Sequence, residues 1–145
     1  FWEDKHKYLR EVEKLGLSSQ VTVIDRYIPN EEIGLYFSAA NVLILPYLQT
    51  SHSAVLQIAL EMGLPVIASD VGGLRESIEN GVNGLLVKPG DSVALAQTIQ
   101  KYLYEGLEDQ FRLNILNKQR ANGWFSIVSL LENLVRTSQS DLGLD

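Results

Sequence analysis

Residues Pro65–Asp91, with the sequence PVIASDVGGLRESIENGVNGLLVKPGD, decide the fold of this chain. The stretch opens with a short apolar run, Pro65–Ser69, which is bounded by turn residues and is typical of a strand covered on both faces. Gly72 and Gly73 follow where such a strand must pass into a helix, and glycine permits the tight turn that this needs. The helix that they open presents unpaired N–H groups beyond the end of the strand.

The second half of the stretch contains two Asn-Gly pairs, Asn80-Gly81 and Asn83-Gly84. We expect both pairs to supply the positive-φ positions that end the helix and begin the next strand, GLLV. Pro-Gly-Asp at residues 89–91 then ends that strand. A Gly-Gly pair alone is more often only a turn, whereas the whole ordered series is much more specific.

This ordered series resembles the C-terminal domain of the retaining glycosyltransferases called group 1 or family 4. Their pattern, G-x-P-V-I-A-x-D-V-G-G-x-P-E followed by G-x-x-G-x-L-V-x-P-G-D, occurs here as GLPVIASDVGGLRE and GVNGLLVKPGD. The chain departs from it at Arg75, where proline is usual. The resemblance extends from about Val21 to Leu103, and more weakly to the C-terminal helix. It implies a Rossmann-like domain that forms one half of a GT-B architecture.

Composition narrows the class of protein. A length of 145 residues, 46% apolar and 21% charged, is ordinary for one globular domain. A net charge of −6 argues against a nonspecific nucleic-acid partner, which needs a basic surface. The chain has no cysteine, no signal peptide and no apolar run of about 18 residues. These features favour the cytoplasm, including the inner face of the membrane.

We interpret residues 1–145 as one truncated C-terminal domain, because the chain begins at Phe1 without methionine. By resemblance, the domain normally opens with a strand and a basic phosphate-binding pair ahead of Phe1, and its own N-terminal domain is absent here. A sheet that lacks strands has an open edge, so we expect self-association of the fragment. Residues 138–145 are predicted to be a frayed tail.

Apolar runs and helix signals alternate along the chain. We expect Asn30 to cap one helix, and Ile127–Val135 to form the apolar stripe of a final helix, part of which stays exposed. Four strands alternating with helices predict an α/β fold with a doubly wound parallel sheet. Strands are predicted at 21–25, 42–46, 65–69 and 84–87, and helices at 3–15, from 30, 53–62, 91–104, 107–121 and from 126.

Ligands of such sheets bind beyond the carboxyl ends of the strands, so the loops 26–30, 47–53 and 70–74 matter most. The resemblance implies that the first loop holds a nucleobase, largely through backbone groups at Ile28, with Tyr27 and Asn30 beside it. An alternative stays open: the loop is a plain connection in which Tyr27 packs on the next helix.

The loop before residue 53 is followed by a helix that Thr50, Ser51 or Ser53 can cap. A helix start above the carboxyl edge of a sheet favours anions. The resemblance implies that N–H groups from Ser51 to Val55, including that of Ala54, bind the diphosphate of a nucleotide-sugar. A capped core helix without a ligand is the alternative.

The chain lacks a hallmark of the family at this helix. Two glutamates eight positions apart are usual, and the matching positions are Thr50 and Ile58. Ser53-Ala54-Val55 resembles a subgroup with Ser-Gly-Val, which also departs from the pair. Glu61 is the only carboxylate of the helix, about 4.5 Å further along than Ile58. It either reaches a ribose or is a surface charge.

Three further side chains have two interpretations each. His52 contacts donor phosphate or acceptor, or it is simply solvated. Asp70 and Glu76 invite a carboxylate-pair mechanism, which needs a defined separation. Otherwise Asp70 forms the turn, and Glu76 orients the loop of Gly72 and Gly73. We include Gly72 and Gly73 among the binding residues. No catalytic residue is assigned.

Two functions follow from the resemblance. The first is the donor-binding half of a glycosyltransferase that transfers a hexose from a nucleotide-sugar to an unknown acceptor, with retention and without a metal or other cofactor. The second is a catalytically degenerate binding or scaffolding domain, which the missing glutamate pair favours. A receiver domain is excluded, because only Asp25 and Asp70 supply acidic groups at strand ends.

Overall fold

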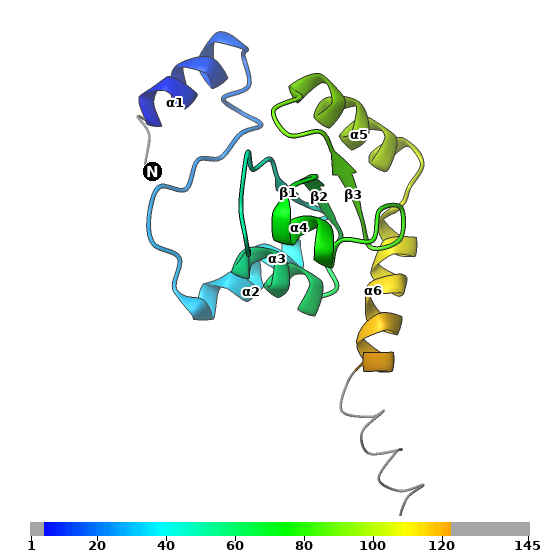
Figure 1. Ribbon diagram of the computed structural model, residues 1–145. Coiled ribbons are helices and arrows are strands. Elements are labelled where there is room, and N and C mark those ends of the chain that lie inside the picture. The colour runs from blue at the N-terminus through cyan, green and yellow to red at the C-terminus, as the bar shows by residue number, and fades with distance from the viewer. Residues whose placement is uncertain (1–4, 123–145) are drawn as a thin grey trace, which may run out of the picture. The chain divides into compact units, whose positions relative to one another are not determined.

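The computed structural model describes residues 5–122, and its elements are labelled in Figure 1. The described residues form two compact units that divide after Gly34, and each is treated by itself. Whether the chain is one domain therefore stays a prediction. The elements, in chain order, are α1 (Lys5–Lys14), α2 (Asn30–Ala39), β1 (Leu43–Leu45), α3 (Ala54–Glu61), β2 (Val66–Ser69), α4 (Gly72–Ser77), β3 (Gly84–Val87), α5 (Ser92–Tyr104) and α6 (Glu108–Asn122).

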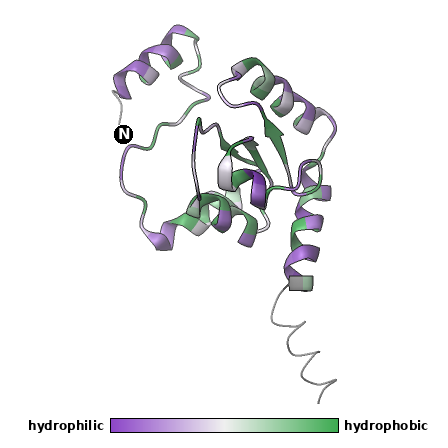
Figure 2. Cartoon of the chain, viewed as in Figure 1, coloured by the Kyte–Doolittle hydropathy of each residue, from purple (hydrophilic) through white to green (hydrophobic). Residues whose placement is uncertain are grey.

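The second unit contains a parallel sheet in the order β1-β2-β3. Leu43 of β1 pairs with Val66 of β2, which pairs in turn with Gly84 of β3. All four residues of β2 are buried, as the sequence predicts for a central strand covered on both faces. Figure 2 shows the strands as the most hydrophobic part of this unit.

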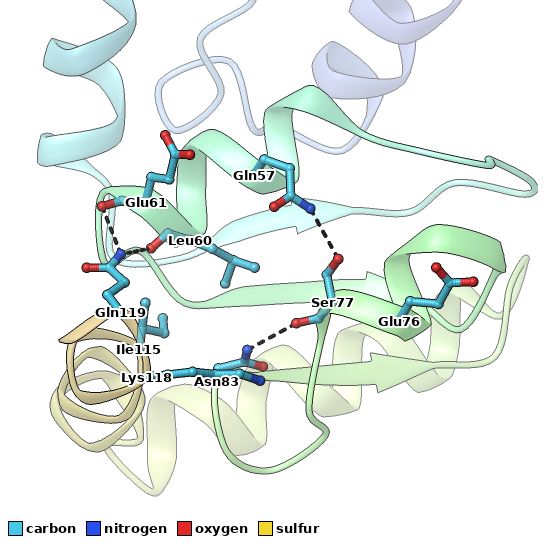
Figure 3. A pocket seen from close by; sticks show the side chains of 9 residues that line it. All are labelled: Gln57, Leu60, Glu61, Glu76, Ser77, Asn83, Ile115, Lys118 and Gln119. Carbon is cyan, nitrogen blue, oxygen red and sulfur yellow. Dashed lines mark hydrogen bonds between the residues drawn. The ribbon is translucent and has the colours of Figure 1, made fainter. Parts of the chain in front are cut away.

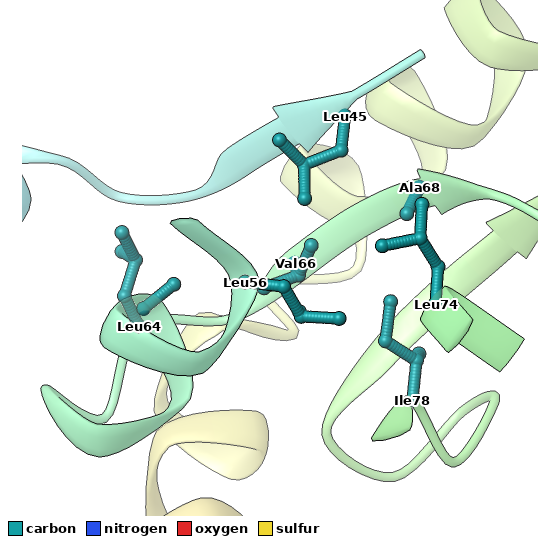
Figure 4. Close-up of a cluster of buried hydrophobic side chains, with 8 residues drawn as sticks. Leu45, Leu56, Leu64, Val66, Ala68, Leu74 and Ile78 are labelled. Atoms are coloured by element: carbon teal, nitrogen blue, oxygen red, sulfur yellow. The ribbon is translucent and has the colours of Figure 1, made fainter. Parts of the chain in front are cut away.

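Helices cover both faces of the sheet, and alternate residues of β2 point into two separate cores. Val66 and Ala68 pack with α3 and α4, as Figure 4 shows. Ile67 packs on the other face against side chains of α5 and α6, including Tyr102 and Phe111. This alternation follows from the two-residue period of a strand. The doubly wound parallel fold is confirmed.

Side-chain caps begin two of the helices, and the cap at Ser53 is one of those that the sequence predicts. The Ser53 hydroxyl accepts a hydrogen bond from the Leu56 N–H at 3.2 Å and caps α3. The Asp91 carboxylate accepts one from the Ala94 N–H at 2.9 Å and caps α5. Each cap satisfies an N–H group that has no acceptor within its own helix.

The two Asn-Gly pairs behave differently. Gly81 has φ +82°, as predicted, but Gly84 has no positive φ and is the first residue of β3. Gly84 is needed for another reason, because a Cβ there would lie 2.3 Å from the Val66 carbonyl oxygen. Asn83 is buried and accepts a hydrogen bond from the Glu79 N–H at 2.8 Å, so its side chain holds the turn.

The first unit differs from the sequence expectation in two ways. Residues 21–25 do not form a strand, and Val21 and Ile24 are 40% and 42% exposed. An apolar run becomes a strand only where a neighbour pairs with its backbone, and the three-stranded sheet does not include this run. Asn30 is the first residue of α2 rather than a cap before it. The predicted final helix and tail lie outside the described residues.

Candidate functional site

The loop that joins β1 to α3 ends in a well-defined helix start. Ser53 has extended backbone angles, φ −138° and ψ 109°, and its carbonyl accepts from the Gln57 N–H at 3.2 Å. The Thr50 hydroxyl donates to the His52 carbonyl at 2.8 Å and so tightens the loop. The N–H groups of Ala54 and Val55 have no acceptor within the helix, since they belong to its first turn. They are available to an anion.

The Gly-Gly pair is built into this loop by close approach. A Cβ at Gly72 would lie 2.0 Å from the Thr50 carbonyl oxygen, and one at Gly73 would lie 2.0 Å from that of Ser51. Gly72 also has φ +34°, which disfavours other residues. The sequence indicates a turn here. The structure shows that the pair is required chiefly because two loops at the carboxyl edge of the sheet touch through their backbones.

A pocket of about 400 Å³ lies beside this contact, and Gly73 belongs to both. The pocket lies between the start of α3 and the helix α4, and it is lined by His52, Ser53, Ala54, Gln57, Gly73, Glu76 and Ser77. The sequence predicted four of these as binding residues: His52, Ser53, Ala54 and Gly73. Thr50, Ser51, Val55 and Gly72 do not line it, although they belong to the same loop and helix starts.

Sequence reasoning missed Gln57 and Ser77, and it gave Glu76 a different role. Helical spacing was the available signal, because Gln57 lies four residues after Ser53, and Ser77 four residues after Gly73. In the structure the Gln57 amide donates to the Ser77 hydroxyl at 3.1 Å, which joins α3 to α4 (Figure 3). This bond holds the two walls of the pocket together.

Arg75, which stands where the family usually has proline, forms an ion pair with Asp70. Its guanidinium donates to both carboxylate oxygens, with an Nη2–Oδ2 distance of 2.8 Å. The hydrogen bond that Arg75 donates to the Asp70 carboxylate raises the pKa of Arg75 above its ordinary value. Asp70 is therefore engaged by Arg75 rather than by Glu76. The backbone N–H of Arg75 donates only a weak hydrogen bond to the Val71 carbonyl, at 3.4 Å. A proline at this position has no N–H and would lose little by its absence.

Glu61 lies at the other end of α3 and lines a neighbouring pocket of about 350 Å³, which shares Gln57, Glu76 and Ser77 with the first pocket. Lys118 and Gln119 of α6 line this pocket too, and the Gln119 amide donates to the Glu61 carbonyl at 2.9 Å (Figure 3). Eight residues of helix separate Ser53 from Glu61, a rise of about 12 Å. The structure therefore does not bring Glu61 to the start of α3.

The first unit contains the predicted nucleobase loop. Tyr27 is 81% exposed, so its ring does not pack on the next helix, contrary to the plain-connection alternative. Arg26 donates to the Tyr27 carbonyl at 3.3 Å. Arg26 also forms an ion pair with Glu32, and the hydrogen bond that it donates there lowers the pKa of Glu32. Ile28 is half-buried. Contact of Tyr27, Ile28 and Asn30 with a nucleobase stays a prediction.

Across residues 5–122, no group of three or more His, Cys, Asp or Glu side chains gathers where it could hold a metal ion. Over the same range, no helix combines the length and the apolar character that crossing a membrane requires.

Comparison with known proteins places this fold and motif series. The family model for glycosyl transferases of group 1 matches residues 3–105, most of the chain. The chain belongs to the group 1 glycosyltransferases. This group 1 glycosyltransferase chain is 27% identical over 137 residues to a D-inositol 3-phosphate glycosyltransferase of Streptosporangium roseum, covering 93% of the chain and 31% of that protein. It is 33% identical over 92 residues to the putative teichuronic acid biosynthesis glycosyltransferase TuaC of Bacillus subtilis, covering 63% and 23%.

Solved structures agree. Sucrose-phosphate synthase from Thermosynechococcus elongatus superposes with a TM-score of 0.73 at 31% identity, covering 94% of the chain and 35% of that structure. Anabaena HepE in complex with UDP-glucose superposes with a TM-score of 0.72 at 23% identity, covering 93% and 36%, and so shows the fold alone. The chain spans about a third or less of the length of the curated relatives it matches.

Proposed function

We propose that this glycosyltransferase chain is the donor-binding part of an enzyme that transfers a hexose from a nucleotide-sugar with retention. The observation that carries the proposal is the pocket at the start of α3, whose wall includes Ser53 and Ala54. Membership of the group 1 glycosyltransferases supports it. So do the names of the HepE structures, which contain UDP or UDP-glucose.

The donor diphosphate would lie against the free N–H groups of Ala54 and Val55, where the helix dipole favours negative charge. Backbone donors need no particular side chain. Diphosphate binding by these N–H groups is therefore compatible with threonine and isoleucine at positions 50 and 58, where the family has glutamates. Contact of Tyr27 and Ile28 with a nucleobase stays a separate prediction. The proposal includes no metal, because the N–H groups and the positive end of the helix dipole would stabilise the phosphate charge. The acceptor is left open, and the cytoplasmic location stays a prediction.

A proline at position 54 tests the proposal by removing one N–H group. Position 54 is the first residue of α3, where proline is tolerated, and Ser53 already has the extended backbone that proline requires before it. A hydrogen bond to a charged group contributes about 1.5–3 kcal/mol, so nucleoside-diphosphate affinity should fall roughly tenfold to a hundredfold. Ala54→Gly is the control, because it keeps the N–H.

The measurement is calorimetric titration of UDP, GDP and ADP into the whole natural protein and both variants. Weaker binding by Ala54→Pro alone supports the proposal. Equal losses in the two variants would mean that the side chain or the helix, not the N–H, matters.

A second function has one observation in its favour. The positions where the family has its glutamate pair are Thr50 and Ile58, and Thr50 is used to tighten the loop through its bond to the His52 carbonyl. A catalytically degenerate binding or scaffolding domain would need no such pair. If none of the three nucleotides binds the unmutated protein, the donor-binding proposal fails and the scaffolding function replaces it.

A further inference from the structure

Glu76 is the acidic side chain of the pocket at the start of α3. The side chains that share the pocket with it are small or carry hydrogen-bonding groups, including His52, Gln57 and Ser77. Glu76 is exposed, and within the described residues its carboxylate has neither a hydrogen-bond nor an ion-pair partner. An unengaged carboxylate in a polar pocket is available to a ligand.

The backbone fixes where this carboxylate lies. Gly73 rests on the Ser51 carbonyl, and Glu76 follows three residues later on the same side of α4. The hydrogen bond from Gln57 to Ser77, the residue next to Glu76, holds α4 against α3 (Figure 3). Glu76 is thereby positioned by two contacts that do not involve its own carboxylate.

The chemistry of a carboxylate selects the ligand group. An ionised carboxylate only accepts hydrogen bonds, and it repels phosphate. Hydroxyl groups are donors, and a nucleotide-sugar carries them on both sides of its diphosphate, on the transferred sugar and on the ribose. A carboxylate accepting from a hydroxyl forms a short, strong bond.

We propose that Glu76 is a specificity-determining residue, whose carboxylate accepts hydrogen bonds from hydroxyl groups in the carbohydrate part of the donor. The inference rests on the proposed function, because it takes the diphosphate to lie at Ala54 and Val55. The role is specific to Glu76 among nearby carboxylates. Asp70 is paired with Arg75, and Glu79 is paired with Lys118 at 3.6 Å. Glu61 lines only the pocket at the other end of α3.

The test compares UDP with UDP-glucose, titrated by calorimetry into the whole protein and its Glu76→Gln variant. If titration shows that the protein prefers GDP or ADP, that nucleotide and its glucose conjugate are used. Loss of one charge-assisted bond should weaken binding roughly tenfold. A loss confined to UDP-glucose assigns Glu76 to the transferred sugar. An equal loss for UDP and UDP-glucose assigns it to the ribose, which both contain.

Glu79→Gln is the matched control, since it removes a neighbouring exposed carboxylate outside both pockets and should leave both affinities unchanged. Glu76→Asp keeps the charge but shortens its reach, and an intermediate loss is expected. Melting temperatures should be unchanged in all three variants. That result separates a role in recognition from a role in the fold.

Two results would overturn the inference in distinguishable ways. If the unmutated protein binds a nucleotide and Glu76→Gln binds UDP and UDP-glucose equally well or more tightly, Glu76 has no such role and the proposed function stands. If the unmutated protein binds no nucleotide, the proposed function fails and this inference fails with it.

Discussion

The apolar runs at residues 21–25 and 65–69 look alike in the sequence but differ in the structure. The second forms β2, in which Ile67 is 0% exposed, whereas the first is not a strand and leaves Ile24 42% exposed. The difference lies in their neighbours, because β2 has a paired strand on each side and helices on both faces. An apolar run thus becomes a strand when other segments satisfy its backbone and cover its side chains.

Truncating one isoleucine in each run tests whether the two runs differ in burial. Ile67→Ala should destabilise the chain by about 2–5 kcal/mol, because it leaves a cavity in a closed core. Ile24→Ala should change the free energy of unfolding by less than about 0.5 kcal/mol. Urea denaturation followed by circular dichroism measures both. Equal losses would mean that residues 21–25 are as buried in solution as β2.

Replacing one glycine in each unit by alanine extends the comparison of the two units. Gly73→Ala should destabilise by about 1–3 kcal/mol, because the new Cβ would lie 2.0 Å from the Ser51 carbonyl oxygen. Gly34→Ala lies in α2 with open space around it, so it should stabilise by up to about 1 kcal/mol. Thermal melts of both variants give the sign directly. A neutral Gly73→Ala would show that the two loops do not touch.

The pH dependence of stability tests the burial of Tyr102 in the core that it forms with Ile67 and Phe111. Burial raises the pKa of Tyr102 to about 12, and its hydroxyl donates to the Asn41 carbonyl at 2.9 Å. Between about pH 10 and 12 the unfolded phenol has lost its proton while the folded one keeps it, so stability falls as the pH rises. We expect Tyr102 to add a slope on the order of 1 kcal/mol per pH unit. Urea titrations across this range should show a shallower slope for Tyr102→Phe, and identical slopes would refute the buried phenol.

The smallest effects are expected at two exposed ion pairs, one in each unit. Arg75→Ala and Arg26→Ala should each lower the stability only slightly, because solvent screens the charges of Asp70 and Glu32. Both losses should shrink in 1 M salt. Denaturation at low and high salt tests this. A large, salt-independent loss for Arg75→Ala alone would show that its pair holds the Gly-Gly loop in place.

Most of the second unit was predictable from sequence, because its signals are local. Ser53 and Asp91 cap helices through their own side chains, and β2 is a continuous apolar run between turn residues. The contacts that build the pocket are not local. Nothing in the sequence shows that the Ser51 carbonyl meets Gly73, or that Gln57 meets Ser77, since each joins segments about twenty residues apart.

The same limit explains the errors. Gly84 follows asparagine, as in many positive-φ turns, yet its glycine is needed by the neighbouring strand at Val66. Residues 21–25 have a strand composition without a strand partner in the described sheet. Each error came from giving a local cause to a residue whose role is set by a distant segment.

Chemical-shift mapping of the backbone amides on addition of UDP tests the central claim most directly, because it locates the ligand residue by residue. The largest shifts should fall on His52, Ser53, Ala54 and Val55, at the start of α3. Glu61 and the residues of α6 should be unaffected. Shifts concentrated on Glu61, Lys118 and Gln119 would place the nucleotide in the pocket at the opposite end of the helix and would contradict the donor site described above.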